Sequence, residues 1–166
     1  MSIKLNIAAI LGATLISANS AVALETVPVL DMDTALKIAG GCQEFAEAEG
    51  WRMNIAIVDR GANLIVFHRM DDAFLGSGDI AIGKAKTSAN FPFSTRFVGE
   101  LAYGVDGAAP GVEGLDEVDG VIAFAGGLPI RAGEFHIGGI GVSGDSADND
   151  EACAKAGLEA VFEEME

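Results

Sequence analysis

The segment Phe135–Ser143 constrains the fold more than any other part of the sequence. Phe, Ile and Val recur through it as in a β-strand, yet glycine stands at positions 138, 139 and 141. Glycine in a strand marks a place where another backbone or a ligand approaches closely. The segment therefore predicts either a helix packed tightly on a sheet, which is the commoner arrangement, or a flat ligand lying against the strand.

The rest of the sequence predicts strands joined by hairpins, with helices before, between and after them. Helical spacing of apolar residues, with stops at Gly50 and Pro92, predicts helices over 31–50, 78–90, 94–103 and from 147 to the end. Runs of β-forming residues predict strands over 52–59, 64–70, 120–125, 128–131 and 135–143. This order predicts an α/β protein of the α+β type, with an antiparallel five-stranded sheet flanked by helices.

Residues 1–23 have the order of a secretory signal peptide. Lys4 precedes an apolar run from Ile7 to Ile16, and the segment ends in Ala21-Val22-Ala23. The run is shorter than the roughly 20 residues that a membrane-spanning helix needs, although an uncleaved anchor is the alternative. We therefore expect a mature single domain over 24–166 that is periplasmic or secreted and has no membrane span.

The chain is strongly acidic. It has 25 Asp and Glu against 10 Lys and Arg, which gives a formal net charge of −15. Removal of residues 1–23 takes away Lys4 and no carboxylate, so 25 against 9 leaves −16. Such a surface repels nucleic acid and anionic membranes, so we expect a small-molecule partner and no nucleic acid.

The two cysteines, Cys42 and Cys153, lie far apart in a chain that we expect in an oxidising compartment. Their spacing matches no zinc site. They form either a disulfide or two buried free thiols. The disulfide is favoured if the first and last helices cover the same face of the sheet.

The sequence lacks the common active-site patterns. The run from Gly138 to Gly144 is rich in glycine, but it reads as a strand followed by a helix cap rather than as a phosphate loop. Ser143 lacks the flanking glycines of a hydrolase nucleophile, and no triad is evident. We therefore predict no catalytic residue and a binding protein rather than an enzyme.

The two histidines are the first candidates for ligand binding. His68 follows Leu64 and Val66 along one side of its predicted strand, as a core histidine or as an axial ligand of heme iron would. His136 alternates with Gly138 and Ile140 on the glycine-rich strand. Its side chain would lie either beside a helix packed on this strand or beside a flat ligand.

Three cations are candidates for binding ligand carboxylates. Lys84, Lys86 and Arg96 lie in or beside the second helical segment of an acid-rich chain. They can receive the propionates of a ligand. Ion pairs with neighbouring Asp and Glu are the commoner use of such residues.

Pairs of carboxylates are weak candidates for a metal site. Glu44 with Glu47, and Asp148 with Glu151, are three residues apart and share a helix face. Such pairs can hold a hard cation or ferric ion at the surface. More often they are solvated, and the helix dipole alone accounts for acids in a first turn.

Several short motifs, taken in order, resemble one family. They are Ile57-Val58-Asp59 with Gly61, Arg69-Met70-Asp71, Lys84-Ala85-Lys86-Thr87, Gly126-Gly127-Leu128-Pro129-Ile130, the run from Gly138 to Gly144, and Asp150, Ala154 and Gly157 in the final helix. Together they span about residues 31–162. The chain thereby resembles the GlcG/HbpS family of heme-binding-like proteins, which includes the C-terminal domain of PduO-type corrinoid adenosyltransferases.

The resemblance implies a profilin-like fold and assembly into homo-oligomers. It implies heme as cofactor, with the iron ligand sought on the strand of His68 or in the segment from Thr87 to Thr95. Lys84 or Arg96 would then hold the propionates. The family usually has an aliphatic residue in place of His136, so this histidine is a departure. The candidate cofactor-binding residues are His68, His136, Lys84, Thr95 and Arg96.

The expected function is an exported heme or tetrapyrrole binding protein for storage, transport or sensing. The alternative is an accessory protein or enzyme acting on a small hydroxy acid of the glycolate type, or on a corrinoid. In that alternative Asp59 or Asp71 would be the base. A structural oligomer without a working ligand site is the third possibility, because function resides in sites rather than in folds.

Overall fold

The computed structural model describes residues 26–162, so the predicted signal peptide over 1–23 lies outside the described residues. Among the described residues, no helix is both long enough and apolar enough to cross a membrane. The elements in chain order are α1 (Met32–Glu49), β1 (Asn54–Asp59), β2 (Leu64–Arg69), α2 (Ser77–Asn90), α3 (Thr95–Tyr103), the 3-10 helix η1 (Leu115–Glu117), β3 (Gly127–Ala132), β4 (Phe135–Ser143) and α4 (Ala147–Glu159).

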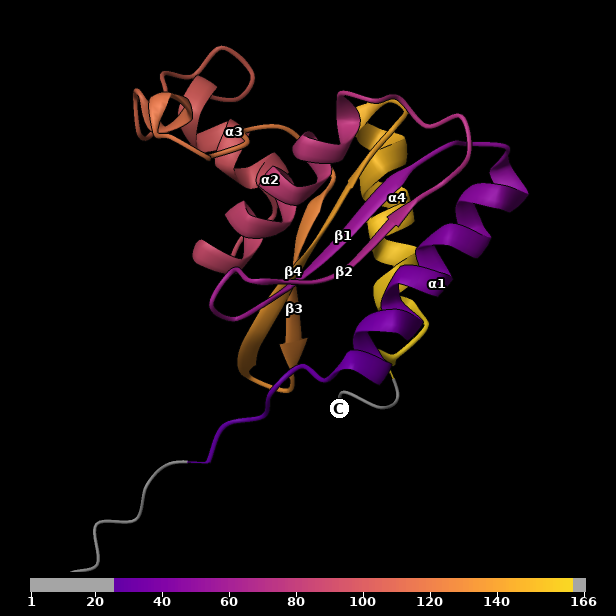
Figure 1. Ribbon diagram of the computed structural model, residues 1–166. Helices are drawn as coiled ribbons and strands as arrows, with labels where there is room; N and C mark the ends of the chain where they lie inside the picture. The colour runs from indigo at the N-terminus through magenta and orange to yellow at the C-terminus, as the bar shows by residue number, and fades with distance from the viewer. Residues whose placement is uncertain (1–25, 163–166) are drawn as a thin grey trace, which may run out of the picture.

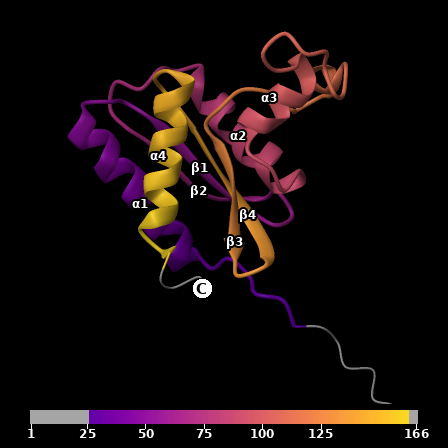
Figure 2. The ribbon, with the colours of Figure 1, turned by 180° about the vertical axis from the view of Figure 1, so that it is seen from behind.

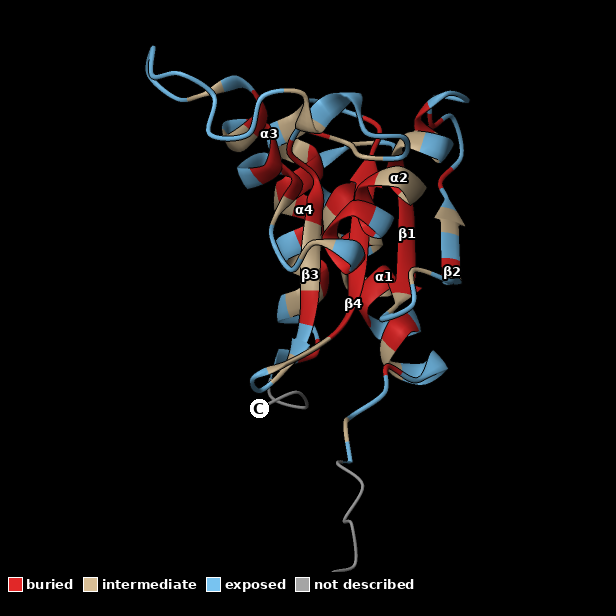
Figure 3. Ribbon diagram, turned by 90° about the vertical axis from the view of Figure 1, so that its left-hand side faces the viewer, coloured by how far each residue is buried: buried red, intermediate tan, exposed pale blue. Residues whose placement is uncertain are grey.

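The four strands form one antiparallel sheet in the order β2-β1-β4-β3. Helices α1 and α4 cover one face, α2 covers the other, and α3 lies beyond α2 (Figures 1 and 2). The predicted α+β architecture is therefore confirmed. The β1 and β4 strands are central, and nearly all their residues are buried (Figure 3).

The sheet departs from the prediction in one strand. Residues 120–125, predicted as a fifth strand, pair with no strand of the described chain. The Ile122 amide donates instead to Thr87 Oγ1 on α2 at 3.0 Å. The chain joins the sheet only at Gly126, where φ is +121° and the carbonyl accepts from the Val142 amide at 2.8 Å. The apolar alternation over 120–125 therefore packs against helices rather than in the sheet.

Local side-chain caps set the helix ends. Asp31 accepts from the Thr34 amide at 2.8 Å and begins α1, and Gly50, with φ +76°, ends it. Ser94 and Ser146 cap α3 and α4 in the same way. These caps agree with the predicted helices to within one or two residues.

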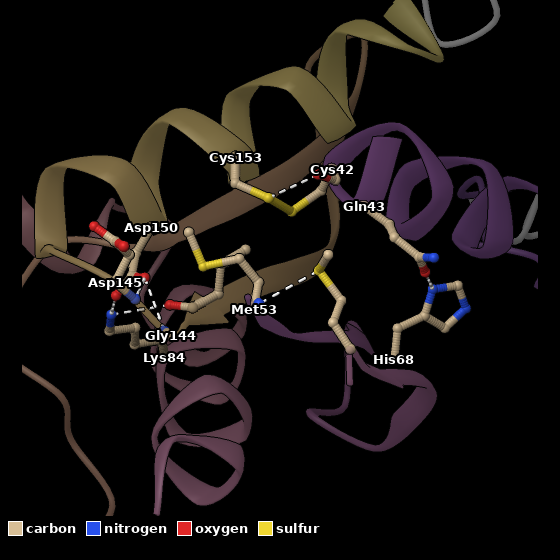
Figure 4. The surroundings of a disulfide bond; sticks show 11 residues. Cys42, Gln43, Met53, His68, Lys84, Gly144, Asp145, Asp150 and Cys153 are labelled. Atoms are coloured by element: carbon tan, nitrogen blue, oxygen red, sulfur yellow. Dashed lines mark hydrogen bonds and ion pairs between the residues drawn. A yellow bond between two sulfur atoms is a disulfide. The ribbon is translucent and has the colours of Figure 1, made fainter. Parts of the chain in front are cut away.

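The face under α1 and α4 is a conventional aliphatic core. Its fully buried side chains include Ile38, Ile57 and Ile140. Cys42 of α1 and Cys153 of α4 form a disulfide over this core, which is the paired alternative of the two (Figure 4). The first and last helices share one face of the sheet, as expected.

The face under α2 consists of small residues. Ala81 and Ala85 of α2 lie against Gly139 and Gly141 of β4. A Cβ atom at Gly141 would collide with the backbone of both alanines. The glycines of β4 therefore admit a helix at very short distance, and no flat ligand can lie between them.

Candidate functional site

His68 is held between β2 and α1 by a chain of hydrogen bonds. Its Nδ1 lies 2.9 Å from Oε1 of Gln43 (Figure 4). The Nε2 of Gln43 donates in turn to Glu47 Oε1 at 2.9 Å, one helical turn further along α1. The half-buried imidazole is thereby oriented by α1, while its second ring nitrogen lies on the side away from Gln43.

A hollow of about 470 Å³ adjoins this chain of hydrogen bonds. Its lining residues are Gln43, Glu47, Arg52, Arg69, Met70 and Asp71. The Arg52 guanidinium donates to the carbonyl of Trp51 at 2.8 Å. Within residues 26–162 neither Arg52 nor Arg69 forms an ion pair, although the chain is rich in carboxylates. Two guanidinium groups therefore remain available to an anionic ligand.

An open strip of α1 continues from Gln43 in the other direction. Leu36, Gly40 and Gln43 are spaced so that they lie on one face of the helix. Leu36 is 45% exposed, and nothing lies within 4 Å of the position that a Cβ of Gly40 would take. This strip offers an apolar surface with free space next to the residue that holds His68.

His136 lies on the opposite face of the sheet from the one expected. A β-bulge at Ile137 shifts the pairing, so that Ile130 faces Gly138 while Arg131 faces His136. Ile137 joins the aliphatic core with Ile140, and His136 points to the α2 side. The predicted alternation with Gly138 and Ile140 is therefore wrong, because the extra residue reverses the faces before position 138.

The ring nitrogens of His136 and His68 lie in different surroundings. The Nε2 of His136 is buried and has no hydrogen-bond partner within the described chain. Burial lowers the pKa of His136, and the nearby charges of Arg131 and Arg60 act in the same direction. Hydrogen bonding to the backbone at Gly138 and Ser88 opposes this shift. The side chain is best described as a neutral histidine packed at the end of α2.

Lys84 is buried in the fold rather than presented to a ligand. Its side chain is 0% exposed, and its Nζ donates to Asp150 Oδ2 at 2.6 Å and to the Val142 carbonyl at 2.9 Å. Asp150 Oδ1 accepts from the amides of Gly144 and Asp145. Burial lowers the pKa of Lys84 and raises the pKa of Asp150, because loss of hydration outweighs their mutual attraction. The pair joins α2, β4 and α4.

Arg96 and Thr95 also have partners within the fold. Arg96 donates to Asp148 at 2.6 Å and to Glu151 at 2.8 Å, and these carboxylates raise the pKa of its guanidinium. The Oγ1 of Thr95 is buried and accepts from the Gly127 amide at 2.8 Å. A ligand would have to displace these partners before it could reach either side chain.

The predicted carboxylate pairs lie in different settings. Asp148 and Glu151 both face the guanidinium of Arg96. Glu44 and Glu47 are exposed, and Glu47 is the acceptor for Gln43. In the part of the chain that the structure describes, no group of three or more His, Cys, Asp or Glu is arranged to hold a metal ion.

The two candidate bases differ in availability. Asp59 Oδ1 accepts from the amides of Gly61 at 2.8 Å and Asn63 at 2.9 Å. These hydrogen bonds lower the pKa of Asp59, which makes it a weak base that holds the β1–β2 turn. Asp71 lines the hollow beside Arg69.

The sequence offered His68 as a candidate but did not indicate the residues that surround it. Gln43, Arg52 and Arg69 were not among the candidates, although Gln43 and Glu47 have the i, i+4 spacing of a helical pair. That spacing is common on any helix surface. Their relation to His68 follows only from the position of α1 across the sheet.

The sequence and fold are similar to those of several known proteins. The family model described as "Haem degrading protein HbpS-like" matches residues 30–159. Protein GlcG of Escherichia coli (strain K12) is 30% identical over 120 residues, which are 72% of this chain and 85% of GlcG. The crystal structure of HbpS has 30% identity and a TM-score of 0.74, covering 83% of this chain and 94% of HbpS. That of a PduOC:heme complex has 27% identity and a TM-score of 0.73, covering 80% and 95%.

Proposed function

The chain belongs to the HbpS-like family, and on this basis we propose that it binds heme with His68 as the iron ligand. The observation that carries the proposal is the setting of His68. Its imidazole is half-buried, oriented through Nδ1 by Gln43, and adjacent to a hollow with two arginines that have no ion-pair partner in the described chain. A protein of similar fold was solved as a PduOC:heme complex, which supports heme as the bound molecule.

The surrounding residues fit heme in three respects. A half-buried imidazole provides a nitrogen ligand. Arg52 and Arg69 can hold propionates, a role that the sequence had suggested for Lys84 and Arg96, which are engaged in ion pairs. Leu36 and the open space at Gly40 suit the edge of a flat apolar ring. Heme itself would supply an iron atom that the imidazole of His68 could bind.

Titration of the purified mature protein with hemin, followed by absorbance, tests the proposal. We expect a saturable, shifted Soret band. His68→Ala should weaken binding by more than the roughly 10- to 100-fold that loss of an outer-shell partner costs a metal site. His136→Gln is the matched control and should leave the titration unchanged, because its Nε2 is enclosed at α2. A wild-type spectrum identical to that of free hemin would reject heme binding.

We propose that this binding serves storage, transport or sensing of heme outside the cytoplasm. The proposal rests on the signal-peptide pattern of residues 1–23. Mass spectrometry of the protein recovered from the periplasm or medium should find a chain that begins at Leu24. An intact Met1 on a membrane-bound protein would contradict export in this form.

We also propose that the protein forms homo-oligomers through an apolar surface on α3 and the segments around it. This α3 surface consists of Phe93, Phe97, Tyr103, Val105, Val112, Val118 and Phe124, all exposed. It lies at the end of the molecule that projects away from the sheet (Figure 1). Concentrated apolar exposure of this kind is typical of protein interfaces. Light scattering should show an assembly that Phe97→Glu dissociates, whereas Leu75→Glu, exposed elsewhere, leaves it intact.

A second candidate function uses the same hollow. Arg52 and Arg69, which have no ion-pair partner among residues 26–162, favour a small hydroxy acid of the glycolate type, with Asp71 as the available base. In that case hemin would leave no shifted Soret band, while glycolate would raise the melting temperature of the wild type and not of Arg69→Gln. A hemin titration that depends on His68 would reject this candidate as the main function.

A further inference from the structure

We infer that Gln43 and Glu47 are positioning residues that fix the proton of His68 on Nδ1 and leave Nε2 as the ligating nitrogen. The inference rests on the proposed function for the role of Nε2. The hydrogen bonds themselves form in the protein without ligand. Its three residues come from two elements, α1 and β2, that meet only in the folded chain (Figure 4).

Glu47 sets the orientation of the Gln43 amide. A side-chain amide has one end that donates and one that accepts, and either end can face a given neighbour. A carboxylate such as that of Glu47 only accepts hydrogen bonds. The NH₂ end of Gln43 therefore faces Glu47 at 2.9 Å, and the carbonyl end faces His68.

The Gln43 carbonyl in turn sets the position of the proton on His68. The Gln43 carbonyl cannot donate, so the 2.9 Å contact with Nδ1 is a hydrogen bond only when Nδ1 carries the proton. In a neutral imidazole the lone pair then resides on Nε2. Nε2 is thus the nitrogen that can bind iron, and Nδ1–H supplies the outer-shell hydrogen bond that metal-bound histidines usually make.

The backbone of α1 around Gln43 is held in place by the core and the disulfide. Cys42, next to Gln43 in α1, is tied to α4 by the disulfide. Ala39 and Ala46, on either side along the helix, are fully buried in the core. The backbone that carries Gln43 is therefore fixed, and the amide needs only to choose between its two orientations. Glu47 makes that choice.

The experiment measures the tautomer of His68 by long-range ¹H–¹⁵N correlation NMR on the heme-free protein at a pH where the imidazole is neutral. We expect Nδ1–H in the wild type. Gln43→Met removes the acceptor at similar volume and should shift the population toward Nε2–H. Gln43→Glu restores an acceptor and should restore Nδ1–H. Glu47→Gln should give a mixture, because two amides can pair in either orientation.

Glu44→Gln is the matched control, since Glu44 is exposed on the same helix while Glu47 is the carboxylate that accepts from Gln43. It should leave the tautomer unchanged. In hemin titrations, Gln43→Met should weaken binding roughly 10- to 100-fold and Gln43→Glu should recover it. A wild-type His68 with its proton on Nε2, or a tautomer insensitive to Gln43→Met, would overturn the inference. If the NMR tautomers of the wild type and the variants are as expected, but hemin gives no Soret band that depends on His68, the inference stands and the proposed function is overturned.

Discussion

The two faces of the sheet pack differently, and each carries one of the two histidines. Under α1 and α4 the contacts are made by large aliphatic side chains and a disulfide, and His68 sits at the rim of this face. Under α2 the contacts are made by alanine and glycine, with the Lys84–Asp150 pair beside them and His136 enclosed. The glycines of β4 leave no space for a ligand between that strand and α2. The edge between α1 and β2 has a hollow and an available imidazole.

The difference shows how close packing and ligand binding are separated in this fold. Glycines on β4, which suggested a ligand in the sequence, serve the helix that lies on them. The candidate site instead lies at the sheet edge, where β2 has exposed residues (Figure 3). Because protein interiors are packed as densely as organic crystals, a ligand finds room only where the packing of the elements is incomplete, as at the edge of a sheet.

The largest effect should come from the disulfide on the α1–α4 face. Its cysteines are 111 residues apart in sequence, and closing a loop of about that length contributes about 4–5 kcal/mol in the chain-entropy view. The double variant Cys42→Ala/Cys153→Ala should lose up to that much free energy of unfolding in urea. Reduction of the wild type should cause the same loss. A change well under 1 kcal/mol would show that the aliphatic packing holds this face without the bond.

The next effect concerns the buried ion pair on the α2 side. Asp150→Asn leaves the Lys84 ammonium without its charged partner, which should cost about 3–5 kcal/mol. The control is Asp148→Asn, whose carboxylate is 81% exposed and pairs with Arg96 at the surface. It should cost less than about 1 kcal/mol. Equal losses of unfolding free energy in urea would remove the distinction between the buried and the exposed pair.

A pair of glycine substitutions compares the two faces directly. Gly141→Ala should destabilise the protein by about 1–3 kcal/mol, because the added Cβ meets the backbone of α2. Gly40→Ala, with open space around it in α1, should stabilise the protein by about 0.5–1 kcal/mol through helix propensity. Thermal unfolding of both variants checks the signs. Destabilisation by Gly40→Ala would mean that the strip beside His68 is not open.

The smallest effect is a pH dependence from His136. Burial lowers its pKa in the folded state below the ordinary value of 6.5, so the unfolded chain binds the proton more readily. This contribution to stability is complete above pH 6.5 and is lost as pH falls toward the folded pKa. Urea unfolding between pH 7.5 and 5 should show a steeper loss in the wild type than in His136→Gln. Parallel curves would indicate that His136 is as well hydrated in the folded state as in the unfolded state.

The candidate site was predicted in part. His68 lies where its strand and its neighbour Val66 placed it, on the α1 side of β2. Lys84, Thr95 and Arg96 are candidates in the sequence because they are polar residues in or near a helix. In the fold, Lys84 and Arg96 pair with carboxylates of α4, and Thr95 accepts a hydrogen bond from β3. Whether a charged side chain faces solvent or a buried partner 66 positions away is invisible to local spacing.

The sequence by itself determined the helices, the turns and the α+β class. Caps such as Asp31 and stops such as Gly50 act within a few residues, so their signals are local. The tertiary structure alone decided which face of the sheet His136 lies on and whether residues 120–125 join the sheet. It also decided that Gln43 contacts His68. A single bulge at Ile137 reverses the side-chain alternation, and its position depends on pairing with β3. Such contacts join residues that are distant in the chain, and they exist only once the helices are seated on the sheet.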